Sequence, residues 1–142
     1  MRNLLIASLT AILLVGCATA NRVPDSEKNV AYSDYVKQQN ISEINKIRSF
    51  RYSGWKELTE RYLILTVSLN KDYLIKFRSN CQGLDFANSI KIQQFTDLVF
   101  DKMGDTIQPV DEMSLKCYVD SIYPLSKEQS DHLVNIGKSK QD

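Results

Sequence analysis

Acidic side chains recur at a regular interval in the C-terminal half of the chain. Asp97, Asp101 and Asp105 are four residues apart, and Asp111 and Glu112 follow. On a helix this spacing would place the first three carboxylates on one face, where their oxygen atoms could bind a hard cation such as Ca²⁺. The residues between them alternate as in a strand, which would scatter the carboxylates over two faces. We therefore expect a solvated acidic surface and no metal site.

Few other residues could carry catalysis. His132 is the only histidine, so no second imidazole is available for a metal pair. Ser68 and Lys71 have the S-x-x-K spacing of a serine–lysine dyad but fall across a predicted turn. An acid–base pair such as Asp85 with Asp101 is suggested by residue type alone. Because the sequence also lacks the nucleotide-binding, zinc-protease and serine-hydrolase motifs, we expect no catalytic residue and no cofactor.

The N-terminus has the layout of a secretory signal. Arg2 precedes an almost wholly apolar run over residues 4–15, which Gly16 and Cys17 close. The run is too short for a bilayer, which takes about 20 residues. Its Leu-x-Gly-Cys ending resembles the bacterial lipobox, in which the cysteine thiol receives a diacylglycerol and becomes the mature N-terminus. We predict that residues 1–16 are removed and that Cys17 is lipidated; the alternative is an ordinary signal peptide that ends near a cysteine.

Lipidation would fix the location of the protein and the use of its other cysteines. The lipobox implies several acyl chains, which anchor durably where one chain binds only marginally. Ala18 stands where lipoproteins retained at the inner membrane of many enteric-type bacteria carry Asp, so the same resemblance favours the periplasmic leaflet of the outer membrane. Cys81 and Cys117 are the thiols that remain, and an oxidising compartment predicts a disulfide between them. Without C-x-x-C spacing, a structural bridge is favoured over a redox role.

Aromatic and basic residues are interleaved between residues 51 and 78. Residues 43–78 carry eight Lys or Arg and four Asp or Glu, whereas residues 79–142 carry six and ten. Core packing and mutual charge compensation are the simpler explanations; the alternatives are a groove for a glycan or an acyl chain, or a basic face for anionic lipid or an acidic partner. From this set we take Trp55, Arg61 and Arg78 as the candidate partner face. The net charge of +1 gives no indication of nucleic-acid binding.

Periodicity predicts the elements that would position these residues. Apolar positions between residues 32 and 47 predict a short helix from Asp34, capped by Ser33, and a second helical piece capped by Ser42. Alternation predicts a strand at 50–57 and a hairpin of strands 62–69 and 73–77. Further along we expect a short helical segment at 84–88 and strands at 90–93, 98–102 and 115–122. Pro124 should stop the last strand, and Ser126-x-x-Gln129 is a capping box for a helix that Gly137 ends.

These elements predict an α+β fold with a short N-terminal helix, a curved antiparallel sheet and a C-terminal helix. The sequence does not decide whether this sheet closes into a small barrel. The expected organisation is a signal peptide over residues 1–16, a lipidated tether over 17–31, one globular domain over 32–137 and a disordered tail over 138–142. A chain of this length can bury a single core without an obligatory metal.

A set of residues between Tyr35 and Leu125 resembles, in order and spacing, a family of small proteobacterial envelope lipoproteins that share a domain of unknown function. The set comprises Trp55, the strand 62–67, Tyr73-Leu74-Ile75, Cys81-x-Gly83-Leu84-x-Phe86-Ala87, Ile90, Asp101 and Lys116-Cys117-x-Val119-x-x-Ile122-x-Pro124-Leu125. Gln82 stands where the family usually has Pro. The resemblance implies an exported single domain with paired cysteines and brings no activity with it.

We therefore expect a membrane-anchored periplasmic lipoprotein with a non-enzymatic binding or structural accessory role in the cell envelope. Its expected partners are the membrane, through the N-terminal lipid, and an envelope protein or a glycan. The alternative is a small envelope hydrolase or cell-wall-modifying enzyme that works through carboxylates.

Overall fold

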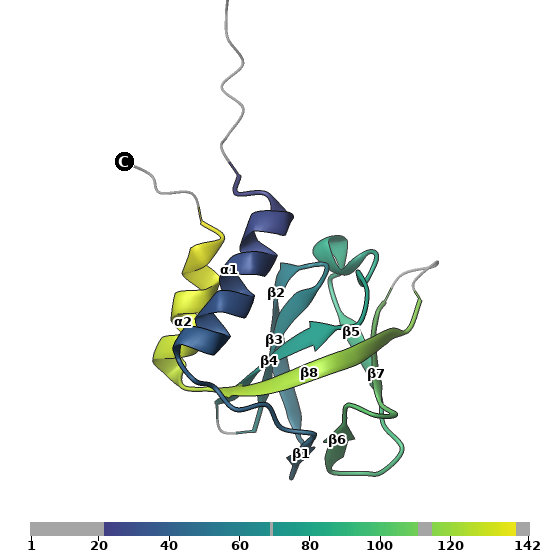
Figure 1. The fold of residues 1–142 in the computed structure, drawn as a ribbon. Helices are drawn as coiled ribbons and strands as arrows, with labels where there is room; N and C mark the ends of the chain where they lie inside the picture. The colour runs from purple at the N-terminus through teal and green to yellow at the C-terminus, as the bar shows by residue number, and fades with distance from the viewer. Residues whose placement is uncertain (1–21, 69, 111–114, 139–142) are drawn as a thin grey trace, which may run out of the picture.

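The computed structural model describes residues 22–68, 70–110 and 115–138. Their fold is an antiparallel sheet curled into a half-barrel, with two helices packed on one side and a two-stranded ribbon on the other (Figure 1). The predicted α+β class, the C-terminal helix and the curved sheet are confirmed. The edge strands of the half-barrel are not paired with each other in the described part of the chain, so the sheet is open.

The six strands of the sheet lie in the spatial order β2 (Tyr52–Thr59), β3 (Tyr62–Val67), β4 (Lys71–Phe77), β8 (Cys117–Leu125), β7 (Thr106–Pro109) and β5 (Ile90–Gln93). The ribbon pairs β1 (Lys46–Arg48) with β6 (Val99–Asp101). The helices are α1 (Asp25–Gln38), α2 (Lys127–Ile136) and a single 3₁₀ turn, η1 (Leu84–Phe86).

The central strands are buried on both faces because the sheet separates two hydrophobic clusters. On one face, Leu63 and Leu65 of β3 pack with residues of the ribbon such as Phe100. On the other face, Ile64 of β3 packs beneath the helices, together with Tyr32 of α1 and Leu133 of α2. Successive strand residues point to opposite faces, so an uninterrupted apolar strand fits this sandwiched position.

Several local predictions are confirmed. The hairpin forms as β3 and β4, although β4 already begins at Lys71 and residue 69 lies outside the described part. The strand at 90–93 is β5. The capping box opens α2: the Gln129 backbone N–H donates to Ser126 Oγ at 3.2 Å, and the Ser126 N–H donates to Gln129 Oε1 at 2.8 Å. This pair satisfies two amide groups that a helix start leaves without partners.

The N-terminal prediction is wrong in its details. A single helix of 14 residues begins at Asp25, after Pro24, so residues 25–31 are helical where we expected part of the tether. Ser42 opens no helix; the chain there is extended, and Ile44 forms a bridge with Ile122. Tertiary packing of Tyr32 and Val36 stabilises a helix whose own amphipathic pattern is weak.

Pro124 does not stop the last strand, which continues to Leu125 and pairs Pro124 with Tyr73 of β4. On its other side, β8 pairs with β7 only at Cys117 and Tyr118. At Pro124, the side of β8 that faces away from β4 is therefore not paired with β7 and needs no amide donor. A sheet tolerates proline at such a position. Strands β1 and β7, of three and four residues, were not predicted.

Candidate functional site

The three residues of the predicted partner face do not lie together. Trp55, in β2, is partly buried against the cluster shared by the sheet and the ribbon. Arg61, in the turn between β2 and β3, lines a hollow beside α1 with Ser33 and Lys76. Trp55 and Arg61 thus lie on opposite faces of the sheet.

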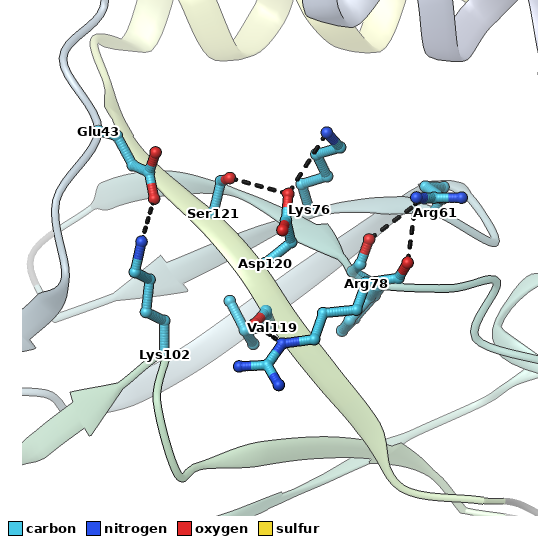
Figure 2. A network of polar contacts seen from close by, with 9 residues as sticks. Glu43, Arg61, Lys76, Arg78, Lys102, Val119, Asp120 and Ser121 are labelled. Atoms are coloured by element: carbon cyan, nitrogen blue, oxygen red, sulfur yellow. Dashed lines mark hydrogen bonds and ion pairs between the residues drawn. The ribbon is translucent and has the colours of Figure 1, made fainter.

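Both arginines of that set donate to backbone carbonyl groups near the end of β4 (Figure 2). Arg61 donates through Nε to the Phe77 carbonyl at 3.2 Å and through a terminal nitrogen to the Arg78 carbonyl at 3.1 Å. Arg78 Nε donates to the Val119 carbonyl at 3.0 Å. The β4–β8 register shifts between Lys76 and Phe77, and the guanidinium groups supply donors where the ladder is irregular. Their contacts are therefore structural.

The interleaved aromatic residues do not form one groove either. Tyr62 is buried beneath the helices, whereas Phe77 is buried in the cluster on the opposite face. Tyr73 is only partly buried on the Phe77 side, and Tyr52 is exposed. Interleaving along the sequence therefore distributes these rings over both faces.

The carboxylates that suggested a cation site instead bind the loop that carries them. Asp105 is 2% exposed, and its two oxygens accept the backbone N–H groups of Phe95 at 2.9 Å and Asp101 at 2.7 Å. Asp101 pairs with Lys46 at 2.8 Å and accepts the Met103 N–H at 3.0 Å. The hydrogen bond from Lys46, and then that from Met103, lowers the pKa of Asp101 below its usual value.

The other predicted acidic residues are dispersed. Asp85 lines a hollow near the start of α1 with Asp25 and Glu57, whereas Asp101 lines a different hollow, so the pair suggested as acid and base is not assembled. Burial raises the pKa of Glu57, and the charge of Asp25 raises it further. Residues 111 and 112 lie outside the described part. Within the described ranges, no group of three His, Cys, Asp or Glu residues could hold a metal ion.

The remaining predicted residues have structural surroundings. His132 stacks on Tyr35 with ring centroids 4.6 Å apart. Cys81 and Cys117 form the predicted disulfide, with Cα atoms 5.4 Å apart and Cys81 fully buried. This bridge ties the segment before η1 to the start of β8. Cys17 lies outside the described residues.

Sequence reasoning missed an exposed apolar loop, residues 94–105, which we call the aromatic loop. Phe95 is 88% exposed and Met103 is 72% exposed, and a Cβ atom on Gly104 would lie 3.1 Å from the Phe95 ring. Two hollows flank the loop: one of about 470 Å³ that includes Lys46 and one of about 460 Å³ that includes Tyr118. The available signal was Met103, an apolar residue directly before a glycine in a short polar stretch.

The fold and these surface features define a small, disulfide-bridged α+β domain that presents a fixed apolar loop beside two hollows. The chain belongs to a family of unknown function (DUF6491), whose model matches residues 1–140. No curated protein and no solved structure matches the chain. No helix within the described residues is long and apolar enough to cross a membrane.

Proposed function

We propose that this protein is a lipoprotein of the cell envelope with a non-enzymatic binding or structural accessory role. Acylated Cys17 would tether it to the periplasmic leaflet of the outer membrane. The Leu14-Val15-Gly16-Cys17 motif after a short apolar run carries this proposal. The Cys81–Cys117 disulfide supports it, because such bridges persist in exported proteins.

A binding role is supported by the hydrogen bonds and the ion pair that the carboxylates of the aromatic loop form. Both oxygens of Asp105 accept backbone amides, and Asp101 is paired with Lys46, so these carboxylates already have structural partners. The same bonds hold Phe95 in an exposed position beside two hollows. An exposed aromatic residue on a rigid support is typical of recognition.

The anchoring is tested by expressing the full chain with Cys17→Ala in a bacterial host. The variant should remain uncleaved or leave the membrane fraction, whereas the wild-type N-terminal peptide should carry acyl mass in mass spectrometry. Ala18→Asp is the matched control: it should still be acylated but should fractionate with the inner membrane. A mature wild-type N-terminus without acyl mass would refute the anchoring.

A further inference from the structure

Three neighbouring strands of the half-barrel place polar side chains in one row beside the aromatic loop. Gln93 of β5 pairs with Thr106 of β7, and Thr106 pairs with Tyr118 of β8. Ile92, next to Gln93, packs against the hydrophobic cluster between the sheet and the ribbon, and Ile107, next to Thr106, lies within that cluster. Because strand side chains alternate, the row lies on the other face of the sheet.

This row forms one side of the hollow of about 460 Å³, and the aromatic loop forms the other. Phe95 and Met103 line it from the loop, and Lys116 lines it from the segment before β8. The volume falls in the range of about 300–1,000 Å³ that is usual for small-molecule sites. The hollow is therefore large enough for a ligand of moderate size.

The groups that line the hollow have a consistent chemistry. Phe95 and the half-exposed Tyr118 offer aromatic faces, whose negative charge density attracts the C–H groups of a sugar ring. The side-chain amide of Gln93 can donate and accept, and it has no hydrogen bond within the described chain. The Thr106 hydroxyl is buried and has no partner among those residues. Aromatic faces beside a free amide group suit a ligand with C–H faces and hydroxyl edges.

Among the described residues, one cationic side chain lines the hollow. Lys116 lines it and has no ion pair within the described ranges. Arg78 lies with its guanidinium carbon 6.0 Å from the centroid of the Tyr118 ring. None of the described residues that line the hollow is acidic. A carboxylate on the ligand could therefore pair with Lys116, and the described lining residues would bring no opposing charge.

We propose that this hollow binds a saccharide that carries carboxylate groups. The proposal rests on the proposed binding function and names its ligand class. The site is pre-organised: Asp105 holds the backbone N–H of Phe95, and the Gln94 side chain donates to the Val99 carbonyl at 2.6 Å. Binding consequently requires little ordering of the loop, which favours affinity.

Isothermal titration calorimetry of the full chain in detergent tests the proposal, with a tetramer of galacturonic acid as the acidic probe and chitotetraose as the neutral one. The acidic sugar should bind, and Phe95→Ala should weaken that binding at least about tenfold. Phe86→Ala is the matched control, because Phe86 is 84% exposed but lines a different hollow. It should change the affinity by less than about twofold. Lys116→Ala should remove the preference for the acidic sugar over the neutral one.

The proposal would be overturned if neither sugar bound at millimolar concentration. An equal loss in Phe95→Ala and Phe86→Ala would also overturn it, as would competition by an oligo-glutamate peptide as strong as that of the acidic sugar. These failures leave the anchoring intact, because acylation of Cys17 is measured separately. Conversely, an unacylated chain that binds the acidic sugar would refute the anchor and not the saccharide site.

Discussion

Asp105→Asn should weaken the hydrogen bonds that hold the aromatic loop. The expected result is a large loss in the free energy of unfolding of the domain. The buried carboxylate accepts two backbone N–H groups, from Phe95 and Asp101. Each hydrogen bond to a charged group contributes about 1.5–3 kcal/mol. Asparagine keeps one carbonyl oxygen but turns an NH₂ group toward the other N–H. One bond is thus weakened and one is lost, and we expect a loss of about 2–4 kcal/mol.

Urea unfolding of the disulfide-bonded protein measures this loss as a lower midpoint with an unchanged slope. Amide hydrogen exchange at Phe95 and Asp101 gives a second readout, because the loop can open without global unfolding. Asp97→Asn is the matched control: it removes the same charge from the same loop, but Asp97 is exposed. Its effect should stay within about 0.5 kcal/mol. If the two variants match in both measurements, Asp105 does not hold the loop and the reasoning is wrong.

Three further predictions concern other parts of the fold. Replacing Cys81 and Cys117 together by serine opens a bridge with a sequence separation of 36, and chain entropy predicts a loss of about 3–4 kcal/mol in urea unfolding; unchanged stability would contradict it. Thr106→Val removes a buried hydroxyl without a partner, so stability should hold or rise by up to about 1 kcal/mol, and a clear loss would show that the hydroxyl is bonded. Lys46→Met should remove the share of the stability linked to the lowered pKa of Asp101 that comes from Lys46; this contribution is full above the ordinary carboxyl pKa and is lost as the pH falls through the lowered one. The stability difference between wild type and variant should therefore vanish in acid, and a difference that does not depend on pH would refute this origin.

The elements that could be predicted are those specified by local sequence. Alternation alone identifies the β3–β4 hairpin, and Ser126 with Gln129 identifies the start of α2. The start of α1 has no comparable signal, because its first turns are polar and the helix depends on packing of Tyr32 against the sheet. The short strand β1 owes its conformation to β6, which is distant in the sequence, and β7 owes its conformation to pairing with both β5 and β8.

The candidate site could be predicted less well than the fold. The prediction of the partner face was wrong because strand alternation and the burial of both sheet faces separate Trp55 from Arg61. The expected solvated acidic surface was wrong for Asp105, because this residue lies buried in a tight loop, where its carboxylate accepts nearby backbone amides. The row of Gln93, Thr106 and Tyr118 spans three strands, so no linear motif could reveal it.

The position of the aromatic loop bears on the kind of ligand that it meets. The chain enters the domain at the start of α1, whereas the β1–β6 ribbon and its loop lie at the opposite end of the molecule (Figure 1). Helix α1 alone, with 14 residues, extends about 21 Å from that entry point. In the proposed lipoprotein, a lipid on Cys17 would hold the start of α1 near the bilayer and turn the loop away from it. A ligand of the hollow would then come from the surrounding compartment, which agrees better with an acidic saccharide than with a lipid headgroup of the anchoring membrane.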